Sequence, residues 1–293
     1  MHSVSLIYPH QLFKEHPSID RKRKIYIVED PLFFKQFAFH KQKLVFHRAS
    51  MKLYADELKK LGYEVSYIDC QQDLSSTEQL FKHFKKTGVQ TIYLCDPVDY
   101  LLTRRIKRFA TKYKIQLSVE ESPNFISSNK ANELFFAERK RYFMNDYYIH
   151  QRKEFQILVN DNKPEGGKWT YDTENRNKIP KGTAIPEYSI PNVNAYTKEA
   201  IDYVEQYFGS NLGSSFPFYY PIDHSSATKQ LDVFLKERFN NYGVYQDAIV
   251  QSETFLFHSI ISPLLNTGLL DPGYIIDRTI TYANDNSIPL NSL

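Results

Sequence analysis

Several residue types and patterns that mark other protein classes are scarce or missing in this 293-residue sequence. The two cysteines, Cys70 and Cys95, are too few for a disulfide framework, a cysteine-based zinc site or a four-cysteine iron–sulfur cluster. No run of about 18 apolar residues occurs, so the sequence predicts no membrane-spanning helix. The first residues also lack the apolar core of a secretory signal peptide. We therefore expect a cytoplasmic protein that holds no metal in this chain.

Glycine is scarce as well, and the 10 glycines form none of the loops that usually cradle phosphates. Neither the G-x-G-x-x-G pattern of dinucleotide-binding proteins nor the G-x-x-x-x-G-K-[ST] pattern of nucleotide triphosphatases occurs. The net charge of +3 gives no strong overall field toward nucleic acid. Any phosphate-bearing ligand must therefore be held by a different kind of site.

The first 125 residues alternate between short β-rich runs and helical stretches. The β-rich runs contain β-branched and aromatic residues, and connections to the helical stretches are short. This alternation predicts an α/β domain with a doubly wound parallel sheet over residues 1–125. The predicted strands cover 3–9, 24–30, 65–70, 91–97 and 115–121, and the predicted helices cover 43–63, 76–88 and 99–113.

Three polar residues stand at the carboxyl ends of the first two predicted strands, where ligands bind in sheets of this kind. These residues are His10, Gln11 and Glu29, and they are candidate ligand contacts. The alternative interpretation is that each side chain only caps a helix or closes a turn.

Residues 126–195 predict a helical segment followed by a linker. Residues 137–159 interleave basic with aromatic side chains, which suits nucleic acid because cations bind phosphates and rings stack on bases. The alternative, which we favour, is an amphipathic helix with a solvated basic face and an aromatic stripe in the core. Residues 160–195 are rich in Pro, Gly and Asn and predict a surface linker that Trp169 anchors.

Residues 196–293 predict the beginning of an all-helical domain, with Thr197 as a helix cap. Two helices are expected to start at Ser262-Pro263 and Asp271-Pro272, because a small polar residue before proline caps a helix. So few helices bury less than an independent domain of this size needs, so we expect the domain to be truncated. One apolar stripe is expected to stay partly exposed; it comprises Ala227, Leu231, Phe234, Leu235 and Phe239.

The expected helix start at Ser262 is preceded closely by His258 and Ser259. Hydroxyl groups together with free backbone N–H groups at a helix start form a site for an anion such as phosphate. Simple capping by Ser262 is the alternative, and both roles use the same N–H groups.

Four blocks of the sequence, in matching order and spacing, resemble the prokaryotic cryptochrome/photolyase-related family of iron–sulfur bacterial cryptochromes and (6-4) photolyases. They are FHKQKLVFHRASMKLYADELKKLGYEVSYID (39–69), GGKWTYDTENR (166–176), FYYPIDHSSATKQLDVFLKERFNNYGVYQDAI (218–249) and HSIISPLLNTGLLDP (258–272). The resemblance covers the family's N-terminal part. It implies an α/β antenna-type domain over 1–125, a helical segment and linker over 126–195, and the start of a helical FAD-binding domain over 196–293.

The function implied by the resemblance is light-driven repair of pyrimidine (6-4) photoproducts in damaged DNA by a lyase of the deoxyribodipyrimidine photolyase type. FAD is the implied cofactor of the full-length protein, and a lumazine-type antenna occurs in the family. The implied iron–sulfur cluster belongs to a C-terminal part that this chain lacks, so the chain alone is not expected to repair DNA. The alternative is a non-catalytic chromophore-binding module or a blue-light photosensor. The sequence does not distinguish a fragment from a naturally short relative.

The resemblance also implies site residues in the helical part. His258, Ser259 and Ser262 fall on positions that hold the FAD pyrophosphate in the wider superfamily, and Tyr245 falls near an upstream tyrosine beside it. His258 replaces a threonine there and still offers a hydrogen-bond donor.

His10, Gln11 and Glu29 are the candidates for antenna contacts. The family's first loop usually reads GDQL, whereas this chain has PHQL with His10. A glutamate that would contact the antenna ring aligns near Phe33. At these two positions the chain departs from the family's lumazine-binding pattern.

Overall fold

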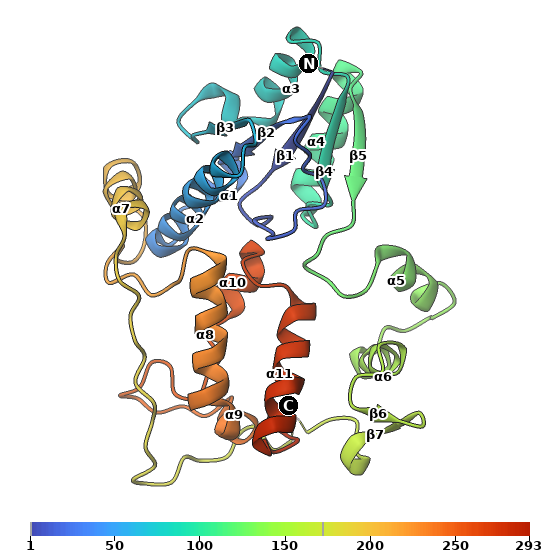
Figure 1. The fold of residues 1–293 in the computed structure, drawn as a ribbon, viewed down its shortest axis with the longest axis vertical. Helices are drawn as coiled ribbons and strands as arrows, with labels where there is room; N and C mark the ends of the chain where they lie inside the picture. The colour runs from blue at the N-terminus through green and yellow to red at the C-terminus, as the bar shows by residue number, and fades with distance from the viewer. Residues whose placement is uncertain (1, 172) are drawn as a thin grey trace. The chain divides into compact units, whose positions relative to one another are not determined.

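The computed structural model of the protein describes residues 2–171 and 173–293. It divides into two compact units, each of which is assembled from segments that are distant in the sequence (Figure 1). The first unit comprises residues 1–124, 189–228 and 262–271, and the second comprises 125–188, 229–261 and 272–293. The division into three consecutive domains at 125 and 195 stays a prediction.

The first unit contains a five-stranded parallel sheet, which confirms the α/β fold predicted from the sequence. All five predicted strands are present, and their order across the sheet is β3-β2-β1-β4-β5. In the register, Leu6 on β1 lies opposite Tyr26 on β2 and Leu94 on β4. The strands are β1 (Ser3–Ile7), β2 (Lys24–Val28), β3 (Val65–Ile68), β4 (Thr91–Cys95) and β5 (Gln116–Glu120).

Helices flank this sheet on both faces, because the central strands β1, β2 and β4 carry buried apolar side chains on each face. Val4 and Leu6 of β1 join a buried cluster with Phe81 and Phe84, whereas Ile7 is fully buried on the opposite face. The helical elements between the strands are α1 (Pro31–Phe34), α2 (Lys41–Lys60), the 3-10 turn η1 (Asp73–Ser75), α3 (Thr77–Lys86) and α4 (Tyr100–Tyr113). The predicted helices at 43–63, 76–88 and 99–113 are thereby confirmed.

A later helix, α7 (Ala195–Phe208), packs against α2 within the first unit. The prediction that Thr197 caps this helix is wrong. Asn194 is the cap, because its side-chain oxygen accepts a hydrogen bond of 2.9 Å from the backbone N–H of Thr197. Asparagine three residues upstream satisfies the free N–H group, and Thr197 itself is buried in the first turn.

The first unit is completed by the start of α8 (His224–Glu237) and by α10 (Ser262–Thr267). The loop after β1 joins both helices: the N–H of Leu12 donates to Thr267 O over 2.8 Å, and the ring of His224 lies 2.8 Å from Leu12 O. Gly268 follows α10 with φ +80. Helix α10, which carries Ser262, is thus tied to the loop at the carboxyl edge of the sheet.

The second unit is mainly helical. Its helices are α5 (Asn129–Phe136), α6 (Met144–Glu154), most of α8, α9 (Phe239–Tyr245) and α11 (Pro272–Asn286). A short hairpin of β6 (Val159–Asn160) and β7 (Lys163–Pro164) and the 3-10 turn η2 (Glu165–Gly167) lead into the linker. Both predicted helix starts are confirmed, since α10 begins at Ser262 and α11 at Pro272.

Two expectations about helical packing are wrong. The stripe from Ala227 to Phe239 does not stay exposed, because its five side chains are at most 5% exposed. Residues 137–143 do not continue an amphipathic helix; α5 ends at Phe136 and α6 begins at Met144. Over the described residues, no helix combines the length and apolar character needed to cross a membrane.

Candidate functional site

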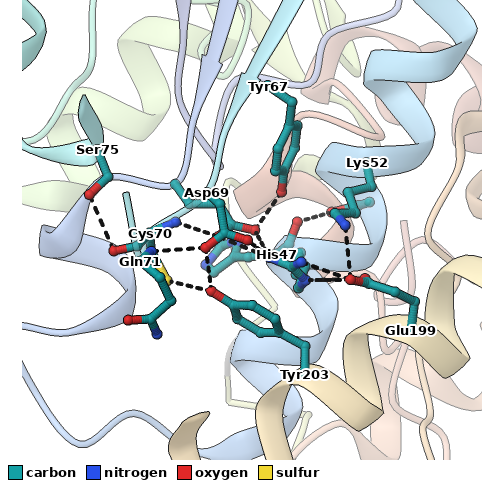
Figure 2. A network of polar contacts seen from close by, with 12 residues as sticks. His47, Lys52, Tyr67, Asp69, Cys70, Gln71, Ser75, Glu199 and Tyr203 are labelled. Atoms are coloured by element: carbon teal, nitrogen blue, oxygen red, sulfur yellow. Dashed lines mark hydrogen bonds and ion pairs between the residues drawn. The ribbon is translucent and has the colours of Figure 1, made fainter. Parts of the chain in front are cut away.

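The carboxyl edge of the sheet in the first unit gathers charged and aromatic side chains, among them Tyr67, Asp69 and Tyr203 (Figure 2). Glu29 at the end of β2 is fully buried there. Arg48 on α2 donates to Glu29 Oε1 over 2.9 Å, and the hydroxyl of Tyr67 donates to the same oxygen over 2.5 Å. The backbone N–H of Cys70 donates to Glu29 Oε2 over 2.9 Å. Protein donors therefore occupy both carboxylate oxygens of this predicted antenna residue.

Arg48 is the centre of this network and is only 3% exposed. Its guanidinium binds Asp69 over 2.8 Å and Glu199 of α7 over 2.7 Å, and it stacks 3.3 Å from the ring centroid of Tyr203. Figure 2 shows Tyr203 and Glu199 reaching from α7 toward the strand ends. The network fixes α2 and α7 against the ends of β2 and β3.

The electrostatics of the network follow from burial and pairing. Burial raises the pKa of Glu29 and outweighs the opposing effect of Arg48. Partial burial also acts upward on the pKa of Asp69, but hydrogen bonds from Tyr203 and Arg48 outweigh it and leave that pKa below its usual value. The several acceptors around Arg48 hold its pKa above the ordinary value despite burial. Arg48 therefore stays charged, as a buried arginine with several carboxylate partners must.

Glu29, Asp69 and Cys70 also bring three potential metal-ligand atoms within 4.8 Å of one another. The guanidinium of Arg48 already supplies the positive charge there, and burial together with Glu29 raises the pKa of the Cys70 thiol to about 12. A protonated thiol and a resident cation do not suit a metal ion.

His10 and Gln11 lie where the strand order reverses, between β1 and β4, which is the crevice that binds ligands in doubly wound sheets. Gln11 is fully buried; its amide donates to Cys95 O over 3.1 Å and its oxygen accepts from the N–H of Tyr8 over 3.2 Å. The ring of His10 lies 2.6 Å from Pro97 O. Both residues thus join the first loop to the end of β4.

An aromatic and histidine group extends from this crevice. The ring of His10 lies 4.9 Å from Phe33, and Phe33 lies 6.3 Å from His47 of α2. Among the described residues, the Tyr8 hydroxyl, His10 Nδ1 and both ring nitrogens of His47 are buried without a hydrogen-bond partner. Burial lowers the pKa of His47 to about 3, so its ring is neutral and offers one donor and one acceptor.

His47 also lines a cleft of about 480 Å³ that lies within the first unit. The volume falls in the range of small-molecule sites. Aromatic, histidine and amide side chains line it, with one lysine whose pKa is lowered by burial. The lining residues are His40, Gln42, Lys43, Phe46, His47, Tyr220, Pro263, Asn266 and Thr267.

The predicted phosphate-side residues lie in and around the segment before α10. Tyr245 ends α9, and its ring is 5.4 Å from that of Phe257 in the second unit. His258 and Ser259 are partly buried, whereas Ser262, the first residue of α10, is exposed and belongs to the first unit. Ile260 has a positive φ of 57, which is costly for a β-branched residue and often marks a functional segment.

Sequence reasoning missed the residues that hold the sheet edge together, namely Arg48, His47, Glu199 and Tyr203. The partners of Arg48 come from β2, from the segment after β3 and from α7, and only the fold brings them together. One signal was present in the sequence: His47 and Arg48 interrupt the apolar run of α2, and an ionisable pair inside such a run indicates a buried polar contact.

Comparison with known proteins now identifies the family. A model of the family described as deoxyribodipyrimidine photo-lyase-related protein matches residues 5–220, more than half of the chain. The chain belongs to this family. This confirms the resemblance to photolyase-related proteins that the sequence blocks indicated.

Individual relatives agree with this family. A (6-4) photolyase of Agrobacterium fabrum is 28% identical over 257 residues, which cover 87% of this chain and 51% of that protein. An uncharacterized protein of Acanthamoeba polyphaga mimivirus is 37% identical over 196 residues, which cover 61% of this chain and 96% of that protein.

A crystal structure of a bacterial class III photolyase from Agrobacterium tumefaciens shares the fold, with a TM-score of 0.52 at 12% sequence identity. The alignment covers 100% of this chain and 55% of that photolyase. The photolyase-related chain therefore spans about half the length of the (6-4) photolyase and of the class III photolyase that it matches.

Proposed function

We propose that this chain forms the N-terminal half of a flavin-dependent protein that repairs pyrimidine (6-4) photoproducts in damaged DNA with light. The observation that carries the proposal is the similarity to a (6-4) photolyase over 87% of this chain. The fold shared with a class III photolyase supports the same family of architectures. The proposed reaction belongs to the whole protein, because the chain spans 51% of that relative.

We propose that Tyr245, His258, Ser259 and Ser262 contact the pyrophosphate of FAD. The left-handed backbone at Ile260, between Ser259 and Ser262, supports this assignment, because costly backbone conformations of this kind cluster at ligand-binding segments. Helix α10 spans only six residues, so its macrodipole adds little, and the hydroxyls and N–H groups carry the interaction.

When bound, FAD supplies the light-driven electron chemistry, and the protein's part is to bind and orient it. The residues of this chain would fix the phosphate end, and the tilted contact between the rings of Tyr245 and Phe257 would support that segment. An iron–sulfur cluster does not fit the cysteines present. Cys70 lies 3.2 Å from the Tyr203 hydroxyl, and burial raises the pKa values of both Cys70 and Cys95 to about 12.

A second candidate function, a non-catalytic chromophore-binding or photosensor module, is favoured by the first unit alone. Its cleft of about 480 Å³ and the unpartnered nitrogens of His47 fit a planar ligand with polar edges. His10 and Gln11 at the crevice are the proposed antenna contacts. Gln11 and Glu29 are weaker candidates than His10, because the protein engages both ends of the Gln11 amide and both oxygens of Glu29, whereas His10 Nδ1 is buried without a partner among the described residues.

The flavin assignment is tested by a Ser259→Ala, Ser262→Gly double variant. Glycine keeps most of the capping ability of serine, so the variant removes hydroxyl contacts with little loss of helix stability. The free energy of FAD binding should become less favourable by about 1–3 kcal/mol, the range for hydrogen bonds to a charged partner. FAD affinity and melting temperature are measured side by side.

Ser252→Ala serves as the control, since Ser252 is an exposed serine in the same unit as Ser259. It should leave FAD affinity unchanged. If the double variant keeps its FAD affinity while its melting temperature falls, the two serines only stabilise the segment, and the phosphate assignment is wrong.

A further inference from the structure

Residues 137–143 connect α5 and α6 (Figure 1). Three consecutive large apolar side chains, at the end of this connection and the start of α6, are exposed. Tyr142 is 73% exposed, Phe143 58% and Met144 79%. The amphipathic-helix interpretation required these rings to face a core, and they do not. Consecutive exposed aromatics on a surface are unusual enough to indicate a binding surface.

Two cations stand directly beside these rings. Lys140 and Arg141 are exposed, and within the described part of the chain neither is paired with a carboxylate. The neighbouring Arg139 is engaged instead, since it lies 3.6 Å from Asp146 and over the ring of Phe135. The exposed cations Lys140 and Arg141 therefore stand directly before the exposed rings of Tyr142 and Phe143.

Contacts between aromatic rings hold Tyr142 against α5, and α5 against α6. The ring of Tyr142 meets Phe136 of α5 edge to face with centroids 5.3 Å apart, and Phe136 stacks on Tyr147 of α6. Phe135 stacks on His150 at 4.5 Å. Rings held by such contacts lose little conformational entropy when a ligand stacks on them.

We propose that residues 139–144 bind single-stranded nucleic acid. Tyr142 and Phe143 stack on bases, and Lys140 and Arg141 neutralise the adjoining phosphates. Every base has a face that stacks, so the interaction depends little on sequence. The contact needs neither flavin nor light nor a lesion, so it stands apart from the repair function proposed above.

A lipid surface is the other partner that combined apolar and basic groups can attract. Interfacial binding requires one broad apolar face along a helix. Helix α6 instead carries Asp146, Arg152, Lys153 and Glu154 among its aromatic residues, so it presents no such face. Charge and ring placement on this short connection therefore favour a nucleic acid strand.

The test measures binding of the 293-residue chain, in the dark and without flavin, to a fluorescent oligothymidylate of about 16 nucleotides. Tyr142→Ala should weaken binding by about fivefold or more, because stacking on one base is worth at least about that much. Tyr142→Phe should retain binding, since it keeps the ring. A Lys140→Ala, Arg141→Ala double variant should lower the slope of log affinity against log salt by about 1.4.

The matched control is Tyr100→Ala with Arg104→Ala on α4 in the first unit. Tyr100 is 72% exposed, with the Arg104 guanidinium 5.4 Å from its ring, so the pair has the same chemistry at another place. The control should leave binding unchanged.

Three results would overturn the proposal: no binding at low salt, equal weakening by the control pair, or binding to vesicles of anionic phospholipid that Tyr142→Ala abolishes while oligonucleotide binding is unaffected. Unchanged melting temperatures of all variants would show that the altered side chains act at the surface.

Discussion

Arginine stacks on an aromatic ring in both compact units, with different consequences. In the first unit, Arg48 lies 3.3 Å from the ring centroid of Tyr203, is 3% exposed and has three carboxylate partners. In the second, Arg139 lies 4.0 Å from the ring centroid of Phe135 and is exposed, with one exposed partner. A buried arginine–aromatic pair helps to hold the fold together, whereas an exposed pair belongs to the protein surface and adds little stability.

This difference in burial gives a criterion for assigning roles to charged residues in this chain. Enclosed groups whose hydrogen bonds are complete hold elements together, and Glu29 is such a group despite its place at a ligand-binding edge. Groups that are enclosed but unpartnered, such as His47, point to a ligand. Exposed cations beside exposed rings, such as Arg141 beside Tyr142, point to a macromolecule.

The largest expected effect separates the two arginines directly. Arg48→Met should lower the free energy of unfolding by about 3–5 kcal/mol, because it leaves the buried Glu29 carboxylate without its counter-charge. Arg139→Met should lower it by less than about 1 kcal/mol, as expected for an exposed pair. Urea unfolding followed by fluorescence measures both. Equal losses of stability in the two variants would contradict the distinction between a structural Arg48 and a surface Arg139.

Two glycines with the same φ of +80 extend the comparison to the backbone. A Cβ at Gly268 would lie 2.6 Å from the ring of Phe13, whereas a Cβ at Gly88 meets nothing within 4 Å. Gly88→Ala should cost about 1 kcal/mol for the left-handed conformation alone, and Gly268→Ala about 2–4 kcal/mol because repacking is added. Thermal melting of both variants would contradict this account if Gly88→Ala were the more damaging change.

The buried His47 should make the free energy of unfolding fall by about 2 kcal/mol between pH 7.5 and pH 5. In the folded chain the pKa of His47 is about 3, below the unfolded value of about 6.5. At pH 5 the unfolded state therefore binds a proton that the folded state does not, so stability falls as the pH drops from about 6.5 toward 3. His47→Phe removes this loss.

The stabilisation by His47→Phe should thus be about 2 kcal/mol larger at pH 5 than at pH 7.5, at about 1.4 kcal/mol per pH unit. Urea unfolding at the two pH values measures it. A gain of the same size at both would show that His47 titrates normally in the folded chain.

The sequence predicted the parallel sheet well because each of its strands is a local signal. The runs at 3–9 and 91–97 are rich in the β-branched and aromatic residues that favour a buried strand, and both form strands. Strands and helices alternate along the sequence, and this alternation is itself enough to predict a parallel sheet flanked by helices.

The sequence did not predict what depends on distant partners. Arg48 meets Glu29, Asp69 and Glu199, which lie 19, 21 and 151 residues away in the sequence. The stripe from Ala227 to Phe239 was expected to stay partly exposed, but Phe234 meets Tyr242 of α9 and Phe239 meets Tyr282 of α11. The cap of α7 was misplaced by three residues for a local reason, since Asn194 and Thr197 are both capping residues and only geometry selects one.

The central functional claim is that this chain recognises the phosphate end of a flavin, and binding of three ligands to the 293-residue chain tests it most directly. FAD and ADP both carry a diphosphate, whereas riboflavin has the flavin ring and no phosphate. The account predicts that FAD and ADP bind with similar affinity, that riboflavin binds far more weakly, and that Ser259→Ala with Ser262→Gly weakens FAD and ADP alike. Riboflavin binding as tightly as FAD, with no binding of ADP, would contradict it.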